Sequence, residues 1–262
     1  MRRVWLISFV LCLATLAVFS RVLLADFVLW DDDISVYRNP HIQGLDSTRL
    51  RWMFSDASYG LRYEPLNWLA YALIHHFSGL NPSGYHFANL LLHSLNTVLV
   101  FIVIRRLLAA GSEVVDPLQA ATLPAAIGTL LWAVNPLRVE PVAHVTDLRY
   151  CLLLFFLMIS LWSYLRAHQG GHNARGQPWF YWCSVAAFAL SMLSLPFAVG
   201  YVFVLVALDW YPLRRFEGCS HCWRDVQARK ILLEKIPFLL LGGIMLATIV
   251  ARLNPTGVWA AH

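Results

Sequence analysis

Apolar runs separated by short polar segments dominate this chain. Six runs stand out along the sequence: Val4–Leu24, Gly84–Ile104, Leu118–Val134, Cys151–Leu165, Trp179–Leu208 and Ile236–Ala251. A helix needs roughly 20 predominantly apolar residues to cross the hydrocarbon core of a bilayer. The pattern therefore predicts an all-α polytopic membrane protein.

The run Trp179–Leu208 is too long for a single span. Its 30 residues would form a helix of about 45 Å, whereas the hydrocarbon core is about 30 Å thick. Pro196 lies inside the run, where proline removes a backbone donor and clashes with the preceding turn. We therefore predict two shorter helices that meet at Ser194–Pro196, and about seven transmembrane helices in the whole chain.

A long polar segment, residues 25–83, follows the first apolar run and contains two further helical patterns. Ser47–Ser55 predicts a short helix with its first serine as N-cap. Tyr63–Leu80 is more apolar but is interrupted by two histidines, and counting it as a span would reverse the side of every later segment. We interpret both as interfacial helices over the outer face, with Trp68 and Tyr71 at headgroup depth.

The first run has two interpretations. Arg2 and Arg3 followed by Val4–Leu24 is typical of a signal peptide as well as of a first membrane helix. Leu23–Ala25 is a poor cleavage site, so we favour an uncleaved helix whose Arg21 extends to the outer headgroups.

Composition and charge support the membrane prediction and orient it. The chain is 59% apolar and 13% charged, with a mean hydropathy of +0.58, whereas soluble domains carry about 25% charged residues. With seven spans and a cytoplasmic N-terminus, the inner segments hold twelve basic and six acidic residues, and the outer segments eight and nine. This asymmetry follows the positive-inside rule. It predicts a multi-pass protein of the plasma (inner) membrane, or of the ER membrane in a eukaryote, with outer residues 25–83, 135–149 and 252–262 and inner residues 105–117, 166–178 and 214–235.

Three adjacent carboxylates, Asp31, Asp32 and Asp33, come just after the first run. Their mutual repulsion is expected to raise the pKa of at least one of them. A solvated acidic loop is one interpretation. The functional one is a general base that accepts the proton of a hydroxyl, while a neighbouring carboxylate orients the acceptor or holds a cation.

Arginines also lie at the predicted outer face, where the positive-inside rule does not favour them. Arg138, Glu140 and Arg149 flank the end of one span and the start of the next. The arginines are candidates for binding a phosphate leaving group, although contacts with lipid phosphates or a structural Arg138–Glu140 pair would also account for them.

Other polar patterns are less specific. His86, Asn89, His93 and Asn96 form one stripe on a predicted span, which we interpret as interhelical hydrogen bonding rather than a proton relay or metal site. A single Cys219-Ser-His-Cys222 segment lacks a second ligand pair at zinc-site spacing. We therefore predict no metal site and no firm cofactor, although the acidic cluster leaves room for a divalent cation, and nucleic acid is not an expected partner.

An ordered set of short motifs carries a family resemblance. The landmarks are Trp30-Asp31-Asp32-Asp33, Pro65-Leu66-Asn67-Trp68, Asn81-Pro82-Ser83-Gly84-Tyr85-His86, Asn135-Pro136-Leu137-Arg138, Leu208-Asp209-Trp210-Tyr211-Pro212 and Glu234-Lys235-Ile236-Pro237. Their order from about residue 25 to 240 resembles the membrane half of bacterial tetratricopeptide-repeat (TPR) relatives of the transmembrane-and-TPR O-mannosyltransferases, within the C-type glycosyltransferase (GT-C) superfamily.

The resemblance implies a partial GT-C fold in residues 1–252, the start of a truncated outer loop in residues 253–262, and no TPR domain. It implies transfer of a sugar, such as mannose, from a polyprenyl-phosphate donor to a hydroxyl of a protein or glycan acceptor at the outer face. Asp31 and Asp32 match the catalytic acidic pair. Asp33, Arg138, Glu140, Arg149 and His86 are the expected substrate-binding residues.

The chain also departs from the family pattern. Asn135 replaces a histidine, and Leu195 replaces a lysine before proline, which removes a charge if that lysine contacts donor phosphate. A non-catalytic glycolipid-binding or assembly protein derived from the same fold is therefore the alternative. A transporter is a third function class, but the inverted repeats typical of transporters are not evident.

Overall fold

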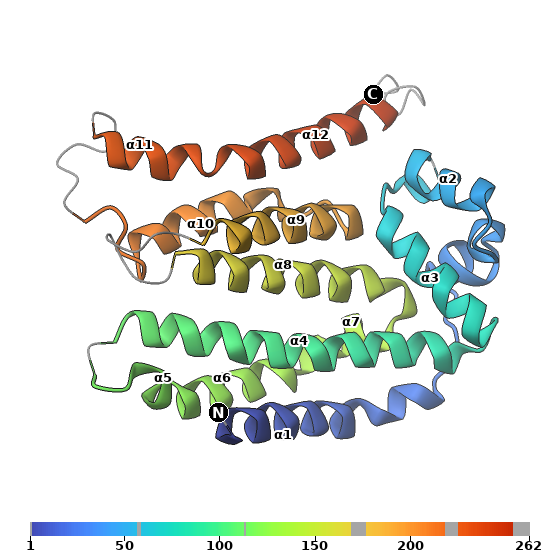
Figure 1. Ribbon diagram of the computed structural model, residues 1–262. Helices are drawn as coiled ribbons and strands as arrows, with labels where there is room; N and C mark the ends of the chain where they lie inside the picture. Colours follow the sequence, from blue (N-terminus) through green and yellow to red (C-terminus); the bar gives the residue numbers. More distant parts are fainter. Residues whose placement is uncertain (1, 57–58, 113, 169–176, 218–224, 254–262) are drawn as a thin grey trace.

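The computed structural model of the protein describes residues 2–56, 59–112, 114–168, 177–217 and 225–253 (Figure 1). In these ranges the regular secondary structure is helical, without strands. The long helices α1 (Arg2–Phe19), α4 (Pro82–Ala110), α8 (Leu148–Ala167), α9 (Pro178–Ser194) and α12 (Ile236–Leu253) lie side by side. The prediction of an all-α protein is confirmed for the described residues.

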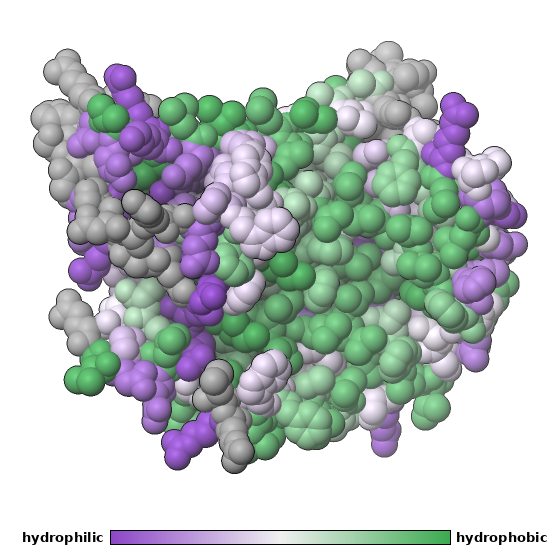
Figure 2. All heavy atoms as spheres, viewed as in Figure 1, coloured by the Kyte–Doolittle hydropathy of each residue, from purple (hydrophilic) through white to green (hydrophobic). Residues whose placement is uncertain are grey.

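Four of the described helices are long and apolar enough to cross a membrane: Arg3–Leu24, Pro82–Ala110, Val145–Ala167 and Val226–Ala251. The helices of Pro117–Ala133 and Pro136–Ala143 add a fifth span if they count as one, although they are bent by 61°. On the face shown in Figure 2, apolar side chains cover the middle and polar ones gather at the two ends. The membrane prediction is supported, while the number of seven spans stays a prediction.

The break predicted inside the longest apolar run is confirmed. Helix α9 ends at Ser194, a 3-10 turn covers Ala198–Gly200, and α10 (Tyr201–Trp210) follows. The ring of Tyr201 stacks on that of Phe188 in α9, with centroids 5.3 Å apart. The proline therefore divides the run into two helices that pack on each other.

Shorter helices connect the long ones. The segment between α4 and α8 contains α5 (Pro117–Ala120), α6 (Thr122–Ala133) and α7 (Val139–Ala143), and α11 (Val226–Leu233) precedes α12. Aromatic and aliphatic side chains of α8, α9, α10 and α12 form the largest apolar core. The Cys219–Cys222 motif lies outside the described residues.

The two helices predicted in the long polar loop are present at one end of the bundle, as α2 (Ser47–Ser55) and α3 (Pro65–Ser78) (Figure 1). The predicted N-cap is wrong, because Asp46 rather than Ser47 accepts the free amides of the first turn of α2. A carboxylate is an equally good cap and also favours the positive end of the helix dipole.

Trp68 and Tyr71 belong to an apolar core of the loop. Their side chains are buried in a cluster that includes Ile42, Met53 and Val145. The Tyr71 hydroxyl donates a hydrogen bond to the Val145 carbonyl at 3.1 Å. Their position at headgroup depth stays a prediction.

Candidate functional site

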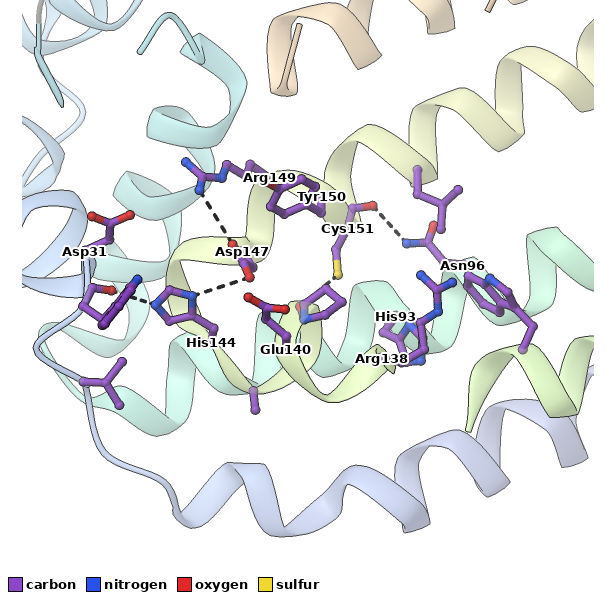
Figure 3. Close-up of a pocket in the computed structure, with 16 residues that line it drawn as sticks. Asp31, His93, Asn96, Arg138, Glu140, His144, Asp147, Arg149, Tyr150 and Cys151 are labelled. Carbon is purple, nitrogen blue, oxygen red and sulfur yellow. Dashed lines mark hydrogen bonds and ion pairs between the residues drawn. The ribbon is translucent and has the colours of Figure 1, made fainter. Parts of the chain in front are cut away.

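A cavity of about 720 Å³ opens at the end of the bundle that carries α2 and α3. Its walls come from the loop after α1, from α4, from the bent α6–α7 segment and from the start of α8. Figure 3 shows Asp31, His144 and Asp147 toward one end of the cavity, and Arg138, His93 and Asn96 toward the other. Residues far apart in the sequence therefore share one site.

The three consecutive aspartates point to different partners. Asp31 has a φ of 72°, a left-handed conformation that aspartate tolerates better than most residues with a side chain. Its Oδ2 accepts a hydrogen bond from Arg62 Nη2 at 2.6 Å, and the side chain lines the cavity. Asp33 instead pairs with exposed Arg38 at 3.5 Å and does not line the cavity.

The pKa of Asp31 is shifted downward, opposite to the upward shift expected for at least one carboxyl of the cluster. The hydrogen bond from Arg62 lowers the pKa of this carboxyl below its usual range, and the positive charges of Arg62, Arg149 and His144 add to the effect against the opposing influence of burial. Each carboxylate of the cluster has a separate cationic or hydrogen-bonding partner, and for Asp31 the Arg62 contact favours the ionised form. Asp31 is therefore ionised at neutral pH.

Asp32 lies behind the cavity wall and is only 1% exposed. Its Oδ1 accepts hydrogen bonds from the backbone amide and hydroxyl of Thr146, at 3.1 and 2.6 Å, and its Oδ2 accepts one from the Val28 amide at 3.0 Å. Both oxygens are thus occupied by the protein itself. Asp32 ties the loop after α1 to the loop before α8.

His144 is a site residue that the sequence did not reveal. Its Nε2 donates a hydrogen bond to the Trp30 carbonyl at 2.8 Å, and Nδ1 lies 3.5 Å from Asp147 Oδ2. Because both ring nitrogens face groups that only accept hydrogen bonds, the protonated imidazolium is favoured. The hydrogen bond to Asp147 is the main reason that the pKa of His144 rises to about 9, with the Trp30 carbonyl and Asp32 contributing.

Arg149 joins the loop helices to the start of α8. Its guanidinium lies 3.6 Å from Glu64 Oε1 and 3.7 Å from Asp147 Oδ1, and it stands over the Tyr150 ring at 5.3 Å. Burial raises the pKa of Glu64, the residue just before the first turn of α3. These contacts are loose, so Arg149 has donor capacity to spare toward the cavity.

Arg138 lines the same cavity without a carboxylate partner. None of the ion pairs among the described residues includes Arg138 or Glu140, so the alternative of a structural pair between them is wrong. The guanidinium stands over the Trp132 ring at 4.8 Å, and its buried Nε makes no hydrogen bond in the described structure. A half-buried arginine with unused donors beside a cavity is suited to an anionic ligand.

The polar stripe of α4 mostly serves helix packing, as predicted. Asn89 donates to the His144 carbonyl at 2.7 Å, Asn96 to the Cys151 carbonyl at 2.9 Å, and His93 Nε2 lies 3.0 Å from the Ala133 carbonyl. His86 is buried and does not line the cavity. Of the predicted substrate-binding residues, the structure therefore brings Arg138, Glu140 and Arg149 to the cavity, but not His86 or Asp33.

Two further observations bear on ligand binding. Leu195, which replaces the family's lysine, is buried at the end of α9 and does not line the cavity. Within the part of the chain that the structure describes, no three His, Cys, Asp or Glu side chains are placed to hold a metal ion. The divalent cation stays a prediction.

Comparisons with known proteins agree with the resemblance. The chain is 28% identical over 242 residues to the human protein O-mannosyl-transferase TMTC4, which covers 87% of this chain and 32% of that protein. It is 27% identical over 212 residues to the mouse protein O-mannosyl-transferase TMTC2, which covers 77% of this chain and 24% of that protein. The chain thus spans about a third or less of the length of these relatives.

No protein-family profile and no solved structure matches the chain.

Proposed function

We propose that this chain is the membrane-embedded catalytic part of a glycosyltransferase. The enzyme moves a sugar such as mannose from a polyprenyl-phosphate donor to a hydroxyl of a protein or glycan acceptor. Similarity over most of the chain to two protein O-mannosyl-transferases supports the reaction class. The predicted charge asymmetry supports an outer-face cavity and a cytoplasmic N-terminus, in the inner membrane of a bacterium or the ER of a eukaryote.

One observation carries the proposal. The cavity contains both a carboxylate with an unoccupied oxygen and an arginine with unused donors. Asp31 Oδ2 is held by Arg62, while its Oδ1 makes no hydrogen bond among the described residues. Arg138, on another wall, has no carboxylate partner there.

The reaction assigns these two groups complementary roles. The acceptor oxygen forms a bond to the anomeric carbon as the bond from that carbon to the donor phosphate breaks. Asp31 Oδ1 takes the hydroxyl proton, and Arg138 stabilises the negative charge left on the departing lipid phosphate. Arg149 supports that charge from the opposite wall, and Asp32 and His144 hold the Asp31 loop in place.

The test replaces Asp31 by asparagine, which keeps the shape and removes the basicity. Asp31→Asn is expected to lower turnover roughly 10²–10⁴-fold with donor affinity largely kept, because a positioned general base contributes about that much. The matched control is Asp33→Asn, which removes a carboxylate two residues away that does not line the cavity. The assay follows labelled mannose from polyprenyl-phosphate mannose to acceptor, with donor binding measured separately.

Full turnover in Asp31→Asn would exclude Asp31 as the base. A glycolipid-binding role without turnover is the second candidate, because the Arg62 contact lowers the pKa of Asp31 and so weakens it as a base. Donor binding without detectable transfer in the unaltered chain would favour that role over the enzyme.

A further inference from the structure

A second cavity lies at the opposite end of the bundle from the candidate site. It has a volume of about 620 Å³ and is enclosed by α1, the last turns of α4, and the α5–α6 segment. These helices meet over a small apolar cluster that contains Leu11, Phe101 and Ala125, with Ile7 packed against it. The cavity is therefore bounded by packed helices.

The polar side of this cavity is basic. Arg105 Nε donates hydrogen bonds to the Leu118 carbonyl at 3.0 Å and to Thr122 Oγ1 at 2.8 Å. These bonds hold the guanidinium in place, while its two terminal nitrogens make no hydrogen bond or ion pair with described residues. Arg3, from α1, likewise has no partner in the described ranges, and no acidic side chain lines the cavity. Among the described residues, two positive charges thus face one space that no carboxylate lines.

The other side of the cavity is apolar. Ile7 and Leu123 line it together with Val4, and Leu123 is 66% exposed on the surface of the bundle. In a membrane this surface faces the acyl chains. The lining therefore combines a site for an anionic headgroup with an adjoining surface for a hydrocarbon tail.

We propose that this cavity binds an anionic phospholipid, with its phosphate between Arg3 and Arg105 and an acyl chain along Ile7 and Leu123. Basic pockets between membrane helices on the cytoplasmic side are suited to anionic headgroups, and the predicted topology puts this end of the bundle in the cytoplasmic leaflet. The bound lipid bridges α1 to the α4–α5 connection. The inference is independent of the proposed glycosyltransferase activity.

The test measures lipid binding to the purified full chain by native mass spectrometry, with phosphatidylglycerol, phosphatidylcholine and inorganic phosphate as separate probes. Phosphatidylglycerol is expected to bind at least about tenfold more tightly than phosphatidylcholine, because only the former brings a net negative charge to unpaired arginines. Arg105→Gln should remove most of that preference, and Arg3→Gln should reduce it severalfold.

Arg106→Gln is the matched control, since Arg106 is the next residue of α4 but stands over the Trp162 ring and does not line the cavity. This variant should keep the preference for phosphatidylglycerol. Arg3→Gln guards against misfolding in Arg105→Gln, because Arg3 makes no hydrogen bond or ion pair with described residues that the variant would break. Equal binding of the two lipids, an unchanged preference in both arginine variants, or competition by millimolar inorganic phosphate would overturn the lipid site.

Discussion

Each end of the helix bundle carries a cluster of ionisable side chains, and the two clusters are built differently. The loop-end cluster comprises Asp31, Asp32, Arg62, Glu64, His144, Asp147 and Arg149. The far-end cluster comprises Tyr164, His168, Asp209, Arg215, Glu234 and Lys235. Both combine carboxylates with cations. Members of the loop-end cluster line the cavity of about 720 Å³, whereas no member of the far-end cluster lines that cavity or the second one.

The far-end cluster is tightly paired. Lys235 Nζ lies 2.6 Å from Asp209 Oδ2 and donates to the Tyr164 hydroxyl at 2.6 Å, and both charged groups are almost fully buried. The Tyr164 hydroxyl lies within 2.8 Å of both Asp209 oxygens. Arg215 completes the set at 3.1 Å from Asp209 and 2.8 Å from Glu234. These contacts join α8, α10 with the segment after it, and the turn between α11 and α12.

The loop-end cluster is more open. The ion pairs of His144 and Arg149 with Asp147 and Glu64 are 3.5–3.7 Å long, and the cavity adjoins several of these groups. Arg138 stands beside the cluster with no carboxylate partner in the described structure. The difference indicates that charge at the far end serves to hold helices together, whereas charge at the loop end is available to a ligand.

The largest expected effect tests the far-end cluster. Asp209→Asn should lower the free energy of unfolding by about 3–5 kcal/mol, because it leaves the buried Lys235 ammonium without its counter-charge. Thermal or chemical unfolding in detergent micelles measures the loss. Adding Lys235→Met to the same chain should recover part of the stability, since an apolar side chain needs no partner.

The loop-end counterpart is Asp31→Asn, which likewise removes the carboxylate of an ion pair, here the pair with Arg62. The side chains of Asp31 and Arg62 are 35% and 22% exposed, so the loss of stability should be about 1 kcal/mol or less. A loss as large as that in Asp209→Asn would contradict the distinction between the two clusters.

The pH dependence of stability should reflect His144. Its pKa is about 9 in the folded protein, against about 6.5 when unfolded, so its contribution is complete below pH 6.5 and is lost as the pH rises toward 9. The contribution is at most about 3 kcal/mol, since one pKa unit corresponds to about 1.4 kcal/mol. Unfolding scans from pH 6 to pH 10 should show this loss in the parent chain and a flatter profile in His144→Gln. Parallel profiles for both proteins would refute the assignment.

The next prediction tests the role of Arg138, which has no carboxylate partner in the described structure. Arg138→Gln should weaken binding of the polyprenyl-phosphate donor by about 1.5–3 kcal/mol, the range for a hydrogen bond to a charged group. Stability should change little, because no carboxylate loses its partner. Arg38→Gln is the control, since Arg38 is 70% exposed and pairs only with Asp33. Equal donor affinities in the two variants would remove Arg138 from the phosphate site.

A small effect is also expected for Tyr164→Phe in the far-end cluster. Asp209 keeps its direct contacts with Lys235 and Arg215, so removing the hydroxyl should lower the unfolding free energy by only about 1–1.5 kcal/mol. Transfer activity, measured with the same labelled donor, should be unchanged. A selective loss of activity without a loss of stability would show that the far-end cluster does more than hold the helices.

Several features of the fold could be predicted because their causes are local. Proline breaks a helix wherever it occurs, so the interruption between Ser194 and Tyr201 was visible in the sequence. The bounds of α2 follow from a capping residue and a short amphipathic run. The length of the apolar runs likewise indicated the long membrane helices. It did not show whether α9 and α10, the two halves of the longest run, each cross the membrane.

The partners of the charged residues were decided by the tertiary structure. Asp32 meets Thr146 and His144 meets the Trp30 carbonyl, in each case across 114 residues of sequence. The positive φ of Asp31 turns its side chain away from those of its neighbours, so adjacent carboxylates do not share one environment. Chain order alone determined that these groups belong to the polar segments between the apolar runs. Which of them is buried, paired or open to the cavity depends on helix packing, because protonation and ligand access are set by distances between segments far apart in the chain.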